Sequence, residues 1–157
     1  MTSMDAKQAG TRLVLVGSTS DRLAGSHFLR IGGDPGVGSD RIPVTDLDRG
    51  PRTAAAIATA IRRGIVRSAH DASEGGILVA AIEMAFSGGL GLEIDLASVP
   101  TDGDVSMVAR AFAEDPSRYL LEVNDADLAT LDEVLGDLPH ATIGSFLAAS
   151  DVASNAA

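Results

Sequence analysis

The residues best suited to chemistry in this sequence stand together in one short segment, SAHDASEGG (residues 68–76). A predicted strand at residues 65–69 leads into His70 and Asp71, and a predicted helix follows. Ser73 suits the N-cap of that helix, and Glu74 would lie in its first turn, where the helix dipole favours a negative charge. The two glycines that come next would let a ligand or another backbone approach closely.

This segment has two interpretations. The structural one is a capped strand-to-helix turn in which the glycines serve tight packing. The functional one is a ligand-binding edge at the C-terminal end of a strand, where α/β sheets often place their sites. Asp71 could then bind a hydroxyl or a metal-bound water, and the amides of Gly75 and Gly76 could meet a phosphate. The residues by themselves leave both interpretations open.

Two other places are weaker candidates. Gly25 and Ser26 open a predicted helix and could hold an anion, although a simple cap is the commoner role of such residues. Glu114 and Arg118 bracket a turn before a strand, where an exposed ion pair would contribute little to stability. The sequence supports no Ser–His–Asp or Cys–His constellation, so no residue of this chain is assigned a catalytic role.

Hydrophobic periodicity indicates strands and helices that alternate with short links. The expected strands are residues 12–16, 65–69, 91–96, 118–123 and 142–147. The expected helices are residues 26–31, 53–63, 74–87, 104–112 and 125–135. This order predicts an α/β (α+β) fold with a mixed β-sheet sandwiched by helices. One domain would occupy residues 1–150, and residues 151–157 would form a disordered tail.

The helix expected at residues 74–87 is apolar on nearly all sides, because only Glu83 is polar between Ile77 and Phe86. Such a helix is buried on several sides. Either it is a central core helix, or a second domain or another chain covers part of it. The glycine-rich residues 32–40 are not followed by Gly-Lys-Ser/Thr, so they are expected to form a surface loop and not a P-loop.

Composition excludes several classes of protein. The 157 residues include 12 basic and 22 acidic side chains, a net charge of −10 that argues against a nucleic-acid partner. There is no cysteine, which rules out a disulfide framework and a thiolate zinc site. His27 and His140 are isolated, without zinc-type spacing. No apolar run approaches about 18 residues and no signal-peptide pattern is present, so we expect a cytoplasmic location and no membrane partner.

Several segments together resemble the second synthetase-type repeat of the phosphoribosylformylglycinamidine synthases. That repeat typically reads Ala-His-Asp-x-Ser-(Asp or Glu)-Gly-Gly-Leu, then an alanine-rich helix and Gly-Gly-Leu-Gly. Upstream it has a strand followed by Gly-x-Thr-x-(Asp or Glu)-Glu-Leu-Gly-Gly-Ser, and downstream Phe-Ser-Glu-Ser-x-x-Arg-Phe-Leu. The similar segments here are residues 3–7, 15–27, 68–76, 83–91 and 112–120.

The resemblance implies an enzyme that uses ATP, Mg²⁺ and glutamine-derived ammonia to convert formylglycinamide ribonucleotide, a phosphorylated ribonucleotide, to its amidine. Its implied partners are N-terminal synthetase domains of the same enzyme and a glutaminase domain or subunit. In the family the nucleotide-binding and metal-binding acids and the catalytic histidine lie largely in the N-terminal domains. We therefore expect this chain alone to be inactive and to bind no cofactor by itself. The implied substrate- or nucleotide-binding residues are Gly25, Ser26, His70, Asp71, Ser73, Glu74, Gly75, Gly76, Glu114 and Arg118.

Related enzymes share the broader scheme, including aminoimidazole ribonucleotide synthetase, selenophosphate synthetase and the hydrogenase maturation dehydratase. His70 before Asp71 favours the purine synthase. Two alternatives remain: the C-terminal domain of a selenophosphate synthetase-like enzyme, and a non-catalytic binding or scaffolding module of the same fold. The sequence departs from the family pattern at Ala24, which replaces a glycine, and at Asp115 and Pro116.

Overall fold

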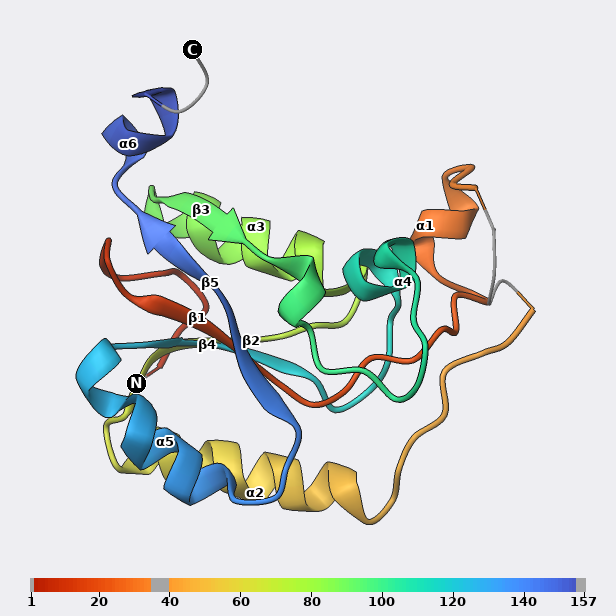
Figure 1. Cartoon of the computed structure of the whole chain (residues 1–157), viewed down its shortest axis with the longest axis horizontal. Helices are drawn as coiled ribbons and strands as arrows, with labels where there is room; N and C mark the ends of the chain where they lie inside the picture. Colours follow the sequence, from red (N-terminus) through yellow and green to blue (C-terminus); the bar gives the residue numbers. More distant parts are fainter. Residues whose placement is uncertain (1, 35–39, 155–157) are drawn as a thin grey trace.

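A five-stranded sheet in the order β2-β4-β1-β5-β3 organises the chain (Figure 1). The computed structural model describes residues 2–34 and 40–154, so residues 35–39 of the predicted glycine-rich loop lie outside the described residues. The strands are β1 Arg12–Val16, β2 Val66–Asp71, β3 Gly91–Ile94, β4 Tyr119–Val123 and β5 His140–Leu147. The helices are α1 His27–Arg30, α2 Arg49–Arg62, α3 Gly76–Gly88, α4 Met107–Phe112, α5 Leu128–Leu135 and α6 Ala149–Ser154, with short 3-10 turns η1 Leu96–Ser98 and η2 Asp125–Asp127. The predicted order of strands and helices through residue 147 is confirmed.

Helices cover both faces of the sheet, with α3 on one side and α2 and α5 on the other (Figure 1). The central strand β1 shows why: its side chains alternate, and both sets are apolar. Leu13 and Leu15 pack in the cluster that includes α3, whereas Val14 and Val16 pack in the cluster that includes α2 and α5. A strand that is apolar on both faces must be covered on both, which fixes the three-layer arrangement.

The α/β fold class is confirmed, but the prediction of a mixed sheet is wrong, because every pair of neighbouring strands is antiparallel. Strands β1, β2 and β3 run in one direction, as expected for strands joined by crossover helices. Strands β4 and β5 run the other way and lie between them. The strand pattern of the sequence contains no information about this interleaving, because a helical link can return the chain in either direction.

Strand β2 continues past the predicted end at residue 69. His70 pairs with Leu120 and Asp71 with Tyr119 in antiparallel register with β4. The histidine and aspartate therefore belong to the last two positions of a strand and not to the turn that follows.

Helix α3 begins later than predicted. Gly75 is its N-cap, with a left-handed φ of 77°, and as a glycine it has no side chain with which to cap the helix. Ser73 is therefore not the N-cap and Glu74 lies before the helix, so both predictions are wrong. Glu114, which is remote in sequence, accepts the Gly75 amide and takes over the capping role that was expected of Ser73.

One face of α3 is buried against the sheet, through residues that include Ile77, Ala81 and Met84. Ile82 is 51% exposed and Phe86 is 85% exposed. The helix is therefore a core helix on one side and presents an uncovered apolar face on the other.

The end of the chain differs from the predicted tail. Helix α6 continues to Ser154, and in Figure 1 it extends from the end of β5 away from the body of the domain. Residues 155–157 lie outside the described residues. Among the helices that the structure describes, none combines the length and apolarity that a membrane span requires.

Candidate functional site

A single carboxylate oxygen, Oε1 of Glu114, joins the three segments that the sequence analysis singled out. It accepts the Gly75 amide at 2.8 Å and the His27 amide at 2.9 Å. The His27 ring Nδ1 lies 3.1 Å from the same oxygen. The N-terminus of α1, the turn before α3 and the segment after α4 therefore meet at one point, which we call the Glu114 junction.

The surroundings of Glu114 favour its charged form. Partial burial by itself would raise the pKa of this carboxyl. The hydrogen bonds from the Gly75 amide and from the amide and ring of His27 outweigh burial, and the pKa is lowered. The junction is therefore held by a carboxylate that accepts several charge-assisted hydrogen bonds.

Gly25 and Ser26 stand at the start of α1, as predicted. Ser26 is the N-cap, and its Oγ accepts the Leu29 amide at 3.4 Å. Gly25 has a φ of +83° and open space around its Cα, so its role is to allow the turn. Because the His27 amide already donates to Glu114, the anion that this helix end binds in the structure is a carboxylate of its own chain.

His70 lies between two carboxylates. Its Nε2 is 3.0 Å from Oε2 of Glu83 on α3, and its Nδ1 is 3.3 Å from Oδ1 of Asp71. The imidazole is mostly buried, with 17% of the side chain exposed, whereas the carboxylates of Asp71 and Glu83 face solvent. This pair links the end of β2 to the exposed face of α3 and gives that face a polar centre beside Phe86.

The turn between β2 and α3 has both free and committed polar groups. Ser73 and Glu74 are exposed. The amides of Gly75 and Gly76, which were expected to meet a phosphate, instead donate to Glu114 and to the Ser73 carbonyl. A Cβ at Gly76 would lie 2.7 Å from the Ala111 carbonyl oxygen, so this glycine is required for packing against the end of α4.

Arg118 was expected on the surface, but only 2% of it is exposed. Burial lowers the pKa of its guanidinium to about 10. The side chain donates to the hydroxyl of Thr19 at 2.9 Å and to the carbonyls of Asp115 and Ala113. The expectation of an exposed ion pair with Glu114 is therefore wrong, and Arg118 instead fixes the backbone of the turn that carries Glu114.

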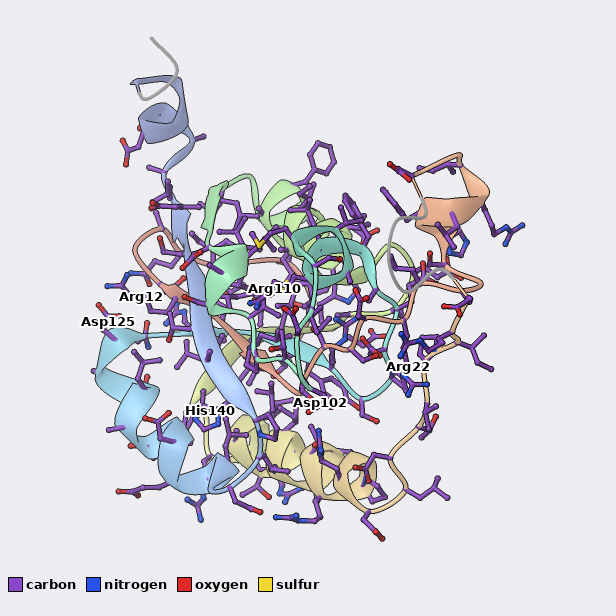
Figure 2. The ribbon with its side chains drawn as sticks, turned by 45° about the vertical axis from the view of Figure 1, so that its right-hand side comes forward. Arg12, Arg22, Asp102, Arg110, Asp125 and His140 are labelled. Atoms are coloured by element: carbon purple, nitrogen blue, oxygen red, sulfur yellow. The ribbon has the colours of Figure 1, made fainter. Side chains whose placement is uncertain are left out.

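A cavity that the sequence analysis missed lies on the other side of this turn. It has a volume of about 410 Å³ and its walls come from the loop after β1, the start of α2, residues 102–104 and residues 115–117. Arg22 and Asp102 on its walls lie at the opposite end of the sheet from the Arg12–Asp125 ion pair (Figure 2). Its walls carry five aspartates and three arginines, so the cavity is polar with an excess of acidic side chains.

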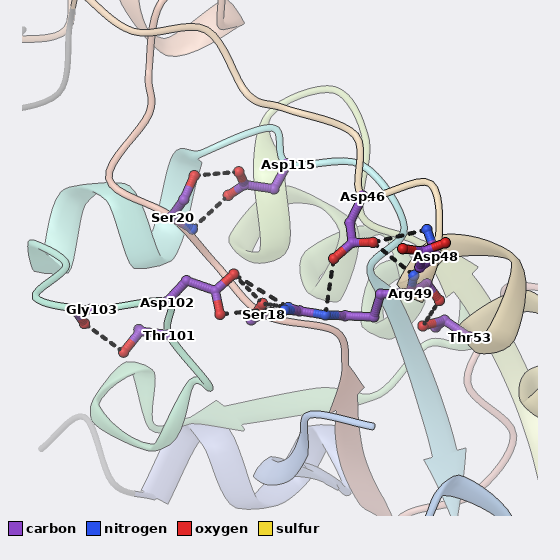
Figure 3. A network of polar contacts seen from close by, with 10 residues as sticks. All are labelled: Ser18, Ser20, Asp46, Asp48, Arg49, Thr53, Thr101, Asp102, Gly103 and Asp115. Carbon is purple, nitrogen blue, oxygen red and sulfur yellow. Dashed lines mark hydrogen bonds and ion pairs between the residues drawn. The ribbon is translucent and has the colours of Figure 1, made fainter. Parts of the chain in front are cut away.

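The centre of this cavity wall is Arg49, the first residue of α2 (Figure 3). Its Nη1 donates to Ser18 Oγ at 2.7 Å and lies 3.3 Å from Asp102, while its Nε lies 3.5 Å from Asp46. Ser117 on the same wall has a φ of 62°, which is uncommon for a residue other than glycine. These residues come from four separate segments, and of them only Ser18 and Ser117 fall within the segments that carry the family pattern.

The described residues contain no group of three or more His, Asp or Glu side chains placed to hold a metal ion. The acids within residues 2–34 and 40–154 therefore do not fit a complete magnesium site.

Comparisons with known proteins identify the family of the chain. The family model of the AIR synthase related protein, C-terminal domain, matches residues 8–154. The chain belongs to this family. Among curated relatives, the phosphoribosylformylglycinamidine synthase subunit PurL of Thermococcus sibiricus is 34% identical over 137 residues, which covers 87% of this chain and 19% of that subunit. The PurL subunit of Deinococcus radiodurans is 36% identical over 160 residues, covering 96% of this chain and 20% of the subunit.

This AIR-synthase-related domain is thus homologous to the C-terminal part of PurL, and it spans about one fifth of the length of the curated relatives it matches. Among solved structures, Thermotoga maritima PurL complexed with FGAR has a TM-score of 0.78 at 20% identity, covering 94% of this chain and 26% of that chain. The hydrogenase maturation protein HypE of Escherichia coli has a TM-score of 0.69 at 18% identity, covering 94% and 46%. At these identities the likeness is one of fold.

Proposed function

We propose that this domain forms one wall of a nucleotide- or ribonucleotide-binding site in an enzyme of the phosphoribosylformylglycinamidine synthase type, and that it is inactive alone. The observation that supports this most is the Glu114 junction. It gathers three segments of the family pattern, which lie up to 87 residues apart, around one carboxylate. A domain that had kept only the fold would not need all three segments at one point.

The outward face of this wall would carry the ligand contacts. Asp71, Ser73 and Glu74 are exposed and lie at the end of β2 or directly after it, where α/β sheets commonly bind ligands. His70 would orient Asp71 through the 3.3 Å contact between them. The Gly75 amide would act indirectly, by holding the turn to Glu114.

The uncovered apolar face of α3 supports the need for a partner. Ile82 and Phe86 lie one helical turn apart and flank Glu83, which contacts His70. Exposed apolar side chains bordered by polar groups are typical of a surface that another domain covers. We propose that the covering partner is an N-terminal synthetase domain, and that the complete enzyme also includes a glutaminase domain or subunit. Thermotoga maritima PurL has been solved as PurLQS, which is consistent with such an assembly.

ATP and Mg²⁺ belong to the complete enzyme in this proposal. T. maritima PurL has been solved in complex with ATP, with ADP and with FGAR. When bound, ATP would supply the phosphoryl group that activates the amide oxygen of the substrate. The part of this chain would be to orient the ligand through Asp71 and Ser73 and to exclude water with the α3 face.

Reconstitution tests the proposal. The chain is titrated with formylglycinamide ribonucleotide, ATP and ADP, alone and with the remaining part of a PurL synthetase. Amidine formation is then measured with ATP, Mg²⁺ and an ammonium salt as the nitrogen donor. We expect activity only in the mixture, with a loss of at least about tenfold for Asp71→Asn, the size of one lost charged hydrogen bond. Glu133→Gln on the exposed side of α5 is the matched control.

Amidine formation by the isolated chain would contradict the claim that it is inactive alone. If the chain neither binds these ligands nor complements the synthetase under any condition, the alternative of a non-catalytic module is favoured.

A further inference from the structure

Residues 3–11, which precede β1, cross one end of the domain and are joined to three of its elements. We call this segment the N-terminal clasp. Backbone hydrogen bonds attach it to β2, α3 and β5 at 3.0, 3.0 and 2.7 Å. The bonded pairs are Ser3 with Ala69, Ala6 with Met84, and Gly10 with Phe146. The sequence analysis noted residues 3–7 as part of the family pattern, but the proposed function gives them no role.

Glu122 of β4 holds the centre of the clasp. The residue is completely buried. Its Oε2 accepts the Lys7 amide and the Ser68 hydroxyl, each at 2.8 Å. Its Oε1 accepts the Gln8 amide at 2.9 Å and lies 3.0 Å from the Thr11 hydroxyl, which shares its one proton with the Gln8 carbonyl at 2.8 Å. Three of these four donors belong to the clasp, so a buried carboxylate depends on the clasp for most of its hydrogen bonds.

The nearest cation compensates this charge only partly. The Nε of Arg67 is 3.9 Å from Glu122 Oε1, and this buried nitrogen has no hydrogen-bond partner. Burying a carboxylate is costly unless hydrogen bonds satisfy it. The clasp amides of Lys7 and Gln8 donate the hydrogen bonds to Glu122 that Arg67 does not. The attachment of the clasp to Glu122 is therefore strongly favourable when the clasp is closed.

Apolar contacts hold the clasp much less. Ala6 is the one clasp residue in the buried core cluster. Segments with few buried apolar contacts open at a lower free energy than the core of their domain. The sheet has its own apolar clusters on both faces, so it does not need the clasp to stay folded.

The clasp also touches the C-terminal half of α3. A Cβ at Gly88 would lie 2.2 Å from the Ala6 carbonyl oxygen, so the two backbones are in direct contact. The Ala6 amide donates to the Met84 carbonyl in the same half of the helix. Phe86 and Glu83, which form the exposed face, belong to this half as well.

We propose that residues 3–11 form a strap that opens and closes as a unit on the folded domain, that Glu122 holds it closed, and that its closure positions the exposed face of α3. The inference does not depend on the proposed function.

Limited trypsin digestion of the full chain tests it, because trypsin cleaves the Lys7–Gln8 bond and the amide of that bond donates to Glu122. Each carboxylate oxygen of Glu122 accepts from two donors. In Glu122→Gln an NH₂ group replaces one of these oxygens, so two donors face a donor and lose their acceptor. We expect cleavage at Lys7 to accelerate by at least about tenfold relative to cleavage after the buried Arg118, which reports opening of the whole fold. Glu93→Gln, an exposed carboxylate on β3, is the matched control and should leave the ratio unchanged.

Gly88→Ala provides a second perturbation that leaves Glu122 intact. Alanine is the better helix former, so α3 is not weakened, but its methyl group displaces Ala6. We expect the same rise in the Lys7 to Arg118 cleavage ratio, and this variant decides the question if Glu122→Gln does not fold. Hydrogen exchange in the second half of α3 should accelerate in both variants.

Equal acceleration at Lys7 and Arg118 would mean that the clasp opens only with the whole fold and would overturn the proposal. Unchanged cleavage at Lys7 in Gly88→Ala would do the same. Faster cleavage with unchanged exchange in α3 would overturn the positioning of that helix.

Discussion

Replacing Glu114 tests the junction on which the site depends, and two substitutions separate its geometry from its charge. All three contacts converge on Oε1, so a glutamine that places its amide oxygen there keeps every acceptor contact. Glu114→Ala removes the acceptor altogether. It leaves the amides of Gly75 and His27 without a partner at the start of two helices.

The expected cost follows from the hydrogen bonds. A hydrogen bond to a charged group contributes about 1.5–3 kcal/mol. Two backbone amides lose such a partner in Glu114→Ala, but water can reach the site in part because 19% of the Glu114 side chain is exposed. We therefore expect a loss of about 2–4 kcal/mol in the free energy of unfolding for alanine. Glutamine should cost about 1 kcal/mol, since only the charge is lost.

Urea unfolding measures both values, and hydrogen exchange at the Gly75 amide shows whether the loss is local. For a domain of this size, 3 kcal/mol corresponds to a decrease in Tm of roughly 6–12 °C. If Glu114→Ala is within about 0.5 kcal/mol of the wild type, the junction does not hold the segments together. If glutamine costs as much as alanine, the position of the oxygen is not what matters and the geometric argument fails.

Three further predictions concern the same wall. Because the pKa of Glu114 lies below its ordinary value of 4.5, its contribution to stability is present above that pH and is lost as pH falls through the lowered value. The stability difference between wild type and Glu114→Gln should therefore shrink in urea unfolding experiments as the pH is lowered below 4.5. Gly76→Ala should lower the free energy of unfolding by about 3 kcal/mol or more, since φ is +73° and the added Cβ meets carbonyl oxygens. The control Gly89→Ala, at φ +66° in open space, should cost only about 1–2 kcal/mol. Equal costs in thermal unfolding would show that packing at Gly76 is irrelevant. Phe86→Glu should change the free energy of unfolding by less than about 0.5 kcal/mol, because the ring is 85% exposed, yet abolish complementation of the synthetase part; retained complementation would place the partner elsewhere.

The sequence alone supports the order of elements and the inward faces of most of them. Leu128, Leu131 and Leu135 recur at helical spacing, and all three pack in the cluster beneath the sheet. The apolar run of β1 could be recognised because burial on both faces leaves no polar position in it. Such patterns are local. A repeat of 2 residues indicates a strand and a repeat of 3.6 residues indicates a helix, whatever the rest of the chain contains.

The candidate site could be recognised from sequence only in part. The three segments of the Glu114 junction could be found by their residue types. Their residue types did not indicate that one carboxylate oxygen would join them. Arg118 carried no local sign of burial, because its partners are two backbone carbonyls, which every residue has, and the hydroxyl of Thr19, which is remote in the sequence. The cavity around Arg49 was missed since its walls come from segments that share no spacing in the sequence.

What the sequence by itself determined is therefore the set of strands and helices and the segments that carry the family pattern, since local periodicity and composition encode both. The tertiary structure decided the direction in which neighbouring strands run, the residue that caps α3 and the groups that remain free to bind a ligand. Two contacts show that the deciding partner is remote in the sequence. Glu114 accepts the Gly75 amide at the start of α3, and the N-terminal clasp donates to the buried Glu122. A hydrogen bond depends on distance in space, and only the folded chain brings such partners together.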